Sequence, residues 1–170
     1  MTIKTVLDTE LLQEFKMTLR IENAAAADIP IGNHFDCGEN SMLIQIMDTC
    51  SSWWPEPKHK FKETYQFEFL DVGDDNDLTE LGCTEEQAIA LTNLLKRALE
   101  NRMQVVVHCH AGICRSGAVV EVAEMMGFTP VDRYRLPNAR VKRLMMKELG
   151  LTYDSTNDIY SEIERQLRYY

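Results

Sequence analysis

Short apolar segments recur along the chain and predict strands. Residues 42–47 (MLIQIM) form an almost continuous apolar run between polar turn residues, and residues 104–107 (QVVV) form a β-branched run. Both patterns are typical of strands buried inside a sheet. Residues 65–70 (YQFEFL) alternate between apolar and polar positions, as a strand with one exposed face does. The segment 16–21 (KMTLRI) predicts a fourth strand.

A second periodicity, with an apolar residue every three or four positions, predicts helices. The clearest example runs from Ala88 to Ala98 and continues to about Arg102. It follows a capping box. In this motif the Thr84 hydroxyl accepts a hydrogen bond from the backbone N–H of Gln87, and the Gln87 side chain accepts one from the backbone N–H of Thr84. Further helices are predicted over residues 24–27, 116–126, 138–149 and 158–168, and glycine follows the second and third of these.

The alternation of strands and helices predicts an α/β layered fold, with helices around a central and mainly parallel sheet. The segment 50–62 is polar and contains Pro55 and Pro57, so we expect a loop there. No internal repeat, linker or low-complexity tract divides the chain, and residues 1–170 are therefore predicted to form a single domain. The order of the strands within the sheet stays open.

The charge balance narrows the range of partners. Eighteen basic residues stand against 27 acidic ones, and the net charge of −9 argues against general binding to nucleic acids or anionic membranes. No apolar run approaches the length of about 18–20 residues that a membrane span needs, and the N-terminus has no signal-peptide pattern. An odd number of cysteines favours free thiols over a disulfide framework. We expect a cytoplasmic protein, and a monomer rather than an oligomer.

The candidate chemistry lies in the segment 105–119 (VVVHCHAGICRSGAV). A buried strand is predicted to end at His108, the loop from Cys109 to Arg115 follows, and Ser116 opens a helix. Active loops in open α/β sheets lie outside the carboxyl ends of the strands. At a helix N-terminus, backbone N–H groups without intrahelical partners and the positive end of the dipole favour an anion. The segment therefore predicts an anion-binding loop.

Three residues give this loop a more specific chemistry. Gly112 permits the backbone conformations in which successive N–H groups converge, and Arg115 supplies a planar fork of donors that matches two phosphate oxygens. Cys109 lies at the base of this electropositive cup, a setting that lowers a thiol pKa from about 8.5 to roughly 3.5–7.5. The residues predict a nucleophilic cysteine that faces a bound tetrahedral dianion.

The sequence HCHAGICRS at 108–116 resembles the His-Cys-(five residues)-Arg-Ser/Thr signature of cysteine-based protein tyrosine phosphatases. The short chain is similar to the dual-specificity subclass and its small bacterial and phage relatives, over about residues 42–126. This resemblance implies that Cys109 attacks phosphorus and forms a phosphocysteine intermediate, while Arg115 clamps the transferring group. It also implies that no metal and no cofactor takes part, and that the partner is a phosphorylated protein or peptide.

The resemblance implies roles for the other residues of the loop as well. Ser116 would donate to the Cys109 sulfur and improve it as a leaving group, and His108 would orient the loop and help to hold the thiolate. The phosphate oxygens would be bound by the backbone amides of His110, Ala111, Gly112, Ile113, Cys114 and Arg115.

A phosphatase of this family also needs an aspartate upstream to protonate the leaving oxygen. In dual-specificity members this residue follows a strand, and Asp71 has that place after Phe67 to Leu70. Its separation from Cys109 is longer than is usual in the family, so Asp74, Asp75 and Asp77 stay open as alternatives.

Other interpretations of the same residues were weighed. A metal site built from His108, Cys109, His110 and Cys114 is disfavoured because no second ligand pair is evident. Cys114 is either a neutral filler or a thiol that resolves oxidised Cys109 as a disulfide. A nucleotide-binding P-loop needs lysine at the position of Ala118, and the alanine there argues against the binding of ATP or GTP.

The sequence therefore predicts a metal-independent protein phosphatase, with phosphotyrosine as the first substrate and phosphoserine and phosphothreonine as further ones. Two alternatives stay open. One is a phosphatase of RNA 5′-phosphates or phosphoinositides. The other is a phospho-binding module of weak catalytic activity.

Overall fold

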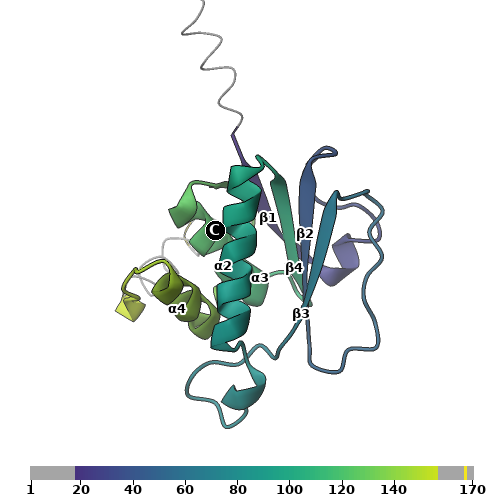
Figure 1. The fold of residues 1–170 in the computed structure, drawn as a ribbon. Helices are drawn as coiled ribbons and strands as arrows, with labels where there is room; N and C mark the ends of the chain where they lie inside the picture. The colour runs from purple at the N-terminus through teal and green to yellow at the C-terminus, as the bar shows by residue number, and fades with distance from the viewer. Residues whose placement is uncertain (1–17, 157–166, 168–170) are drawn as a thin grey trace, which may run out of the picture.

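A computed structural model describes residues 18–156 and residue 167. Its centre is a five-stranded sheet in which every pair of neighbouring strands is parallel (Figure 1). The order is β3-β2-β4-β1-β5. In chain order the strands are β1 (Arg20–Ala25), β2 (Ser41–Met47), β3 (Glu63–Glu68), β4 (Gln104–Cys109) and β5 (Thr129–Pro130). The parallel α/β architecture predicted from the sequence is confirmed.

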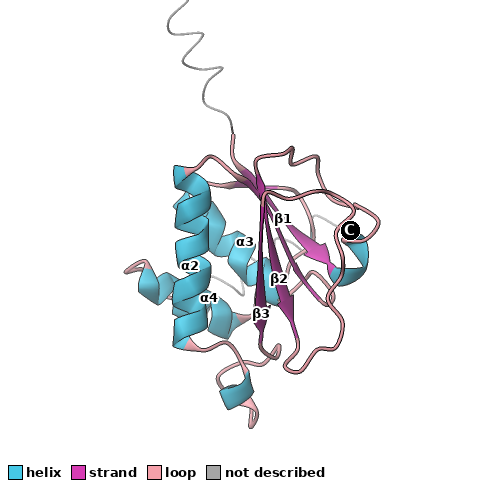
Figure 2. Cartoon of the chain, turned by 45° about the vertical axis from the view of Figure 1, so that its right-hand side comes forward, coloured by secondary structure: helices cyan, strands magenta, loops and turns pink. Residues whose placement is uncertain are grey.

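Within the part of the chain that the structure describes, three α-helices lie on one face of the sheet, which Figure 2 shows nearly edge-on. They are α2 (Glu85–Glu100), α3 (Arg115–Met126) and α4 (Ala139–Glu148). The larger core lies between these helices and the sheet, and α4 packs against both α2 and α3. On this side the apolar periodicity of the helices meets the apolar face of β2 and β4.

The described residues that cover the opposite face of the sheet form loops and a short 3-10 helix, η1 (Ala26–Asp28), rather than α-helices (Figure 2). A smaller core cluster lies here, formed by strand residues such as Leu43 and Val106 with Ile29 and Cys37 from the connection between β1 and β2. Because both faces are covered, every residue of β2 is buried. This explains the continuous apolar run at 42–47.

The helix ends follow the local signals in the sequence. Thr84 and Gln87 form the capping box at the start of α2, and Asn138 caps α4 by accepting from the backbone N–H of Val141. Gly127 ends α3 with a φ of 115°, a left-handed conformation that favours glycine. The helices predicted at 85–102, 116–126 and 138–149 are confirmed, with shifts of one or two residues at their ends.

The prediction for the alanine run at 24–27 was wrong. Ala24 and Ala25 belong to β1, where they lie opposite His108 and Cys109 of β4, and only a 3-10 turn follows. The pairing with a central strand overrides the helix propensity of alanine. The first strand correspondingly begins at Arg20 instead of at 16, and residues 16 and 17 lie outside the described residues, as does the body of the helix predicted at 158–168.

The remaining strand predictions need smaller corrections. β3 begins and ends two residues before the predicted segment 65–70. β4 continues two residues beyond Val107, to Cys109. The second shift has a consequence for the site, because it places the candidate nucleophile on the last residue of a central strand.

Candidate active site

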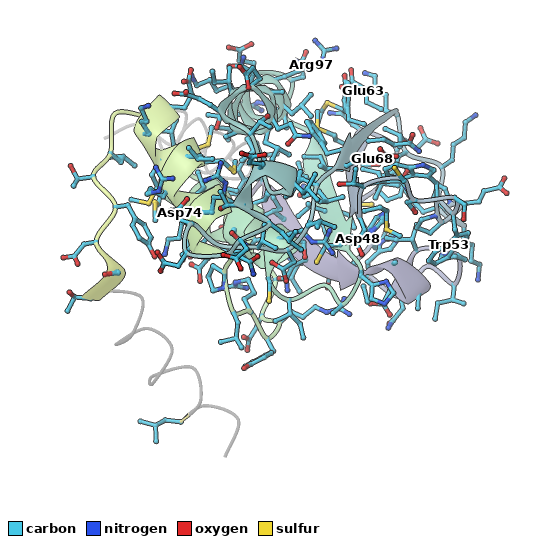
Figure 3. The ribbon with its side chains drawn as sticks, turned by 90° about the horizontal axis from the view of Figure 1, so that it is seen from below. Asp48, Trp53, Glu63, Glu68, Asp74 and Arg97 are labelled. Atoms are coloured by element: carbon cyan, nitrogen blue, oxygen red, sulfur yellow. The ribbon has the colours of Figure 1, made fainter. Side chains whose placement is uncertain are left out.

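A cavity of about 390 Å³ opens at the carboxyl ends of the central strands. Figure 3 views the molecule from this end and shows Asp48 near the middle of it. The residues that line the cavity come from the ends of β2 and β4, from the segment after β3 and from the start of α3: Asp48, Leu70, Asp71, Val72, Cys109, His110, Ala111, Cys114 and Arg115. The fold therefore brings most of the sequence-predicted site residues together.

The loop between β4 and α3 is held by hydrogen bonds to its carbonyl oxygens. Donors from outside the loop reach four of them: Ala26 N to His110 O (3.1 Å), Asn23 Nδ2 to Gly112 O (2.8 Å), Leu136 N to Ile113 O (3.2 Å) and Asn138 N to Cys114 O (2.9 Å). In a trans peptide the N–H points opposite to the C=O. Carbonyls turned outward leave the N–H groups of the loop free to converge on the cavity.

Gly112 makes this arrangement possible. Its φ is 73°, and a Cβ built on it would lie 2.4 Å from the carbonyl carbon of Ala24 and 2.5 Å from the Ala25 nitrogen. The loop thus touches the backbone of β1 directly. Gly112 and Ile113 contribute to the loop but do not line the cavity, whereas His110 and Ala111 do.

Cys109 lies at the floor of the cavity, with its side chain almost wholly buried. Its Sγ is 3.2 Å from the Oγ of Ser116, which is itself completely buried at the start of α3. A hydroxyl at this distance can donate a hydrogen bond to the sulfur. The two residues thus lie together, as the resemblance of the loop implied.

Arg115 has a buried guanidinium that is fixed at one end only. Its Nη1 donates to Asp48 Oδ1 and to the carbonyl oxygen of Phe69, both at 2.7 Å. Its Nε is buried and has no hydrogen-bond partner among the described residues. A buried donor without an acceptor is costly. The Nε–H of Arg115 is therefore an unsatisfied donor in a residue that lines the cavity, and a bound oxyanion would supply an acceptor for it.

Asp48 is a site residue that sequence reasoning missed. It directly follows β2, lines the cavity and pairs with Arg115, while most of its side chain stays exposed. The signal was present in the sequence, because an aspartate at the end of a buried strand was the criterion that selected Asp71.

Of the four candidate acids, Asp71 alone lines the cavity among the described residues. Asp74 instead accepts from Arg140 (2.6 Å) and Arg143 (2.9 Å), and hydrogen bonding, first from Arg143 and also from Arg140, lowers its pKa. It lies well apart from Asp48 in Figure 3. Asp75 and Asp77 are exposed on the same loop. Of these four residues, Asp71 is therefore the one that the fold places beside Cys109 and Arg115.

Cys114 lies beside Asp71. Burial, together with the charge of Asp71 and a hydrogen bond to it, raises the pKa of the Cys114 thiol to about 11. Cys83 and Cys37 are also buried, and burial raises the pKa of Cys83 to about 12 and that of Cys37 to a lesser extent. All five cysteines are free, and these three thiols are protonated at neutral pH.

His108 is completely buried at the end of β4, and burial lowers its pKa to about 4. Its Nδ1 lies 3.4 Å from the carbonyl oxygen of Cys109, and its Nε2 has no partner among the described residues. The imidazole is therefore neutral at pH 7. It can support the loop at Cys109, but it carries no positive charge with which to hold a thiolate.

The low pKa of His108 predicts a pH-dependent stability. The unfolded chain takes up a proton near pH 6.5 and the folded chain only near pH 4, so protons favour unfolding within that window. The contribution of the neutral His108 to the free energy of unfolding is complete above pH 6.5 and is lost as the pH falls toward 4. We expect the free energy of unfolding in urea to fall by about 2 kcal/mol between pH 7 and pH 5 from this group alone.

The His108→Gln variant isolates this contribution, because the carboxylates titrate identically in both proteins. We expect the free energy of unfolding to fall less between pH 7 and pH 5 in the variant than in the wild type, by about 2 kcal/mol. Equal pH dependence in the two proteins would mean that His108 is not buried in its neutral form.

Within the described part of the chain, no group of three or more His, Cys, Asp or Glu side chains is placed to hold a metal ion. No helix among these residues is long and apolar enough to span a bilayer.

Comparison with known proteins found no matching protein-family model and no matching curated protein. In overall fold the chain is similar to OH1 from the Orf virus, described as a tyrosine phosphatase with triple substrate specificity. The TM-score is 0.44 at 16% identity, over 78% of this chain and 83% of that one. It is also similar to human DUSP28 (TM-score 0.41, 8% identity, 88% and 92% covered). A third similar structure is the human tyrosine phosphatase-like serine/threonine/tyrosine-interacting protein (TM-score 0.41, 16% identity, 86% and 87% covered).

Proposed function

We propose that this chain is a metal-independent protein phosphatase that hydrolyses phosphotyrosine, and also phosphoserine and phosphothreonine, through a phosphocysteine intermediate. The observation that carries the proposal is that Arg115, a buried residue whose Nε has no hydrogen-bond partner among the described residues, lines the same cavity as the Cys109 thiol. This arrangement binds a tetrahedral dianion and presents it to a nucleophile.

In the first step the Cys109 thiolate attacks phosphorus. The Sγ–P bond forms as the bond from phosphorus to the ester oxygen breaks, and the leaving oxygen takes the proton of Asp71. Arg115 and the loop amides bind the three equatorial oxygens, where charge accumulates in a loose transition state.

In the second step a water molecule attacks the phosphocysteine and gives its proton to the Asp71 carboxylate. The P–Sγ bond breaks, inorganic phosphate leaves, and the electron pair returns to sulfur. Ser116 Oγ, 3.2 Å from the sulfur, stabilises the departing thiolate by donating a hydrogen bond. Both proton transfers use the same carboxyl group, which therefore returns to its starting state.

The charges around the cavity favour a protein substrate over RNA or phosphoinositides. Asp48 and Asp71 both lie at the cavity, and Arg140 and Arg143 of α4 are paired with Asp74 on the loop that follows Asp71. Substrates with several phosphates would meet these carboxylates without compensating cations. The walls at Leu70, Val72 and Ala111 are small or aliphatic and leave room for an aryl or an alkyl ester.

The proposal is tested by measuring phosphate release from p-nitrophenyl phosphate, a phosphotyrosine peptide, a phosphoserine peptide and a 5′-phosphorylated RNA, with EDTA present and the protein reduced. We expect turnover of the first three, fastest for the two aryl esters, and little release from RNA. No release from any substrate by the folded protein would favour the phospho-binding module. Faster release from RNA would move the assignment to the other phosphatase class.

A separate prediction concerns Asp48. Replacing it with asparagine removes a negative charge next to the bound dianion and retains an oxygen that can accept from Arg115 Nη1. At about 4 Å in water, one pair of unit charges is worth about 1 kcal/mol, so we expect inorganic phosphate to bind about fivefold more tightly. Product inhibition or calorimetry measures this change.

Glu39→Gln is the matched control, because it removes the same charge shortly before the opposite end of β2. It should leave phosphate binding unchanged. Weaker binding in Asp48→Asn would show that the carboxylate is needed to hold the guanidinium of Arg115 in place.

A further inference from the structure

We propose that Asn138 is a positioning residue for the general acid, and that its side-chain amide holds the Asp71 carboxyl beside the phosphate-binding loop. The inference rests on the proposed function and assigns a role to a residue in the connection before α4. Asn138 is 9% exposed and was expected from the sequence to do no more than begin a helix.

The side-chain amide of Asn138 contacts the acid-bearing segment at two points. Its Nδ2 donates to Asp71 Oδ1 at 2.7 Å and to the carbonyl oxygen of Val72 at 3.2 Å. The first bond fixes the carboxyl group and the second fixes the backbone that follows it. Asp71 itself is exposed, and its other partner, the Cys114 thiol, is a weak donor, so without the Asn138 bonds its side chain would sample more rotamers.

Asn138 is in turn held from two sides. Its Oδ1 accepts from the backbone N–H of Val141 at 3.1 Å and caps α4, and its own backbone N–H donates to the Cys114 carbonyl at 2.9 Å. The cap requires an oxygen and the Asp71 carboxyl requires a donor, so the orientation of the amide follows from its partners. One residue thus joins the phosphate-binding loop, the acid segment and α4.

This geometry also gives the two oxygens of the Asp71 carboxyl different surroundings. Oδ1 accepts from the Asn138 amide, which favours the acidic proton on Oδ2. A proton donor held in one orientation reacts with a higher effective concentration than one that rotates freely. By contrast, Asp74 on the same loop is held by two arginines, which favour its ionised form.

The Asn138→Ser variant tests this role. Serine retains a side-chain oxygen that can cap α4, but it has no amide to reach Asp71. The readout is the ratio of kcat for p-nitrophenyl phosphate to kcat for phenyl phosphate, whose leaving group needs protonation more. General acid catalysis contributes about 10²–10⁴-fold. We expect Asn138→Ser to lower kcat for phenyl phosphate about tenfold, with less than a twofold change for p-nitrophenyl phosphate and in KM.

A double-mutant cycle with Asp71→Asn distinguishes positioning from a structural effect. If Asn138 acts through Asp71, adding Asn138→Ser to Asp71→Asn leaves the leaving-group ratio unchanged, whereas independent effects would multiply. Asn40→Ser is the matched control: the Asn40 amide also donates to two carbonyls, those of Asn101 and Arg102, near the opposite end of the sheet. It should not alter the ratio.

The outcomes separate the two proposals. An active wild type with an unchanged ratio in Asn138→Ser overturns the positioning role and leaves the phosphatase in place. An inactive wild type overturns both. If Asn138→Ser does not fold, Asn138→Thr also retains a capping oxygen, lacks the amide, adds no charge beside Asp71 and is measured in the same way.

Discussion

Replacing Cys109 with serine is expected to reduce kcat/KM for p-nitrophenyl phosphate by roughly 10⁴-fold or more, because the reaction loses its nucleophile. A hydroxyl does not ionise at neutral pH and is a poor leaving group from phosphorus. The phosphate-binding loop and Arg115 should keep their positions. Serine occupies less volume than cysteine, and the hydrogen bonds of Arg115 to Asp48 and Phe69 do not involve residue 109. Inorganic phosphate should therefore bind to the variant within about threefold of wild type, as measured by calorimetry.

Cys50→Ser is the control for this experiment, because Cys50 is an exposed thiol that does not line the cavity. It should retain full activity. If Cys109→Ser retained substantial turnover, the nucleophile would lie elsewhere and the phosphocysteine mechanism would be wrong.

The second large effect is expected for Gly112→Ala. A methyl group at this position would lie 2.4–2.5 Å from backbone atoms of Ala24 and Ala25 in β1, and the φ of 73° is strained for any side chain. Overpacking costs about 1–3 kcal/mol and the left-handed conformation about 1–2 kcal/mol. We expect the free energy of unfolding in urea to fall by about 3 kcal/mol, with phosphatase activity almost abolished because the loop must move away from β1.

Gly38→Ala separates the cost of overpacking against β1 from the cost of the left-handed backbone conformation. Gly38 has nearly the same φ, 67°, but nothing lies within 4 Å of a Cβ placed there. This variant should lose only about 1–2 kcal/mol and keep its activity. Equal destabilisation of the two variants would mean that close approach to β1 is not what requires glycine at 112.

The elements that the sequence predicted well are those whose stabilising contacts are local. The capping box of Thr84 and Gln87 joins residues three positions apart, and the end of α3 depends on Gly127 alone. The buried strand at 42–47 was visible because both of its faces are covered, which makes the run apolar throughout. Such signals depend on the residue types within a short segment of the sequence and not on which other segments pack against it.

The alanine run at 24–27 shows where local signals fail. Alanine favours a helix in isolation, but here Ala24 and Ala25 form the end of β1 beside β4. The loop packs so closely over this strand end that Gly112 nearly touches the Ala24 backbone. The pattern of the run alone could not reveal that strand order places it at this position.

For the site, the sequence by itself determined the loop from Cys109 to Arg115, its position between a strand and a helix, and Asp71 as the first candidate acid. Only the tertiary structure decided what surrounds them. The bond from Arg115 to Asp48 and the bond from Asn138 to Asp71 each join residues 67 positions apart. Hydrophobic periodicity shows which residues are buried in an element. It carries no information about which polar side chains meet at the ends of neighbouring strands, because the order of those strands in the sheet determines that.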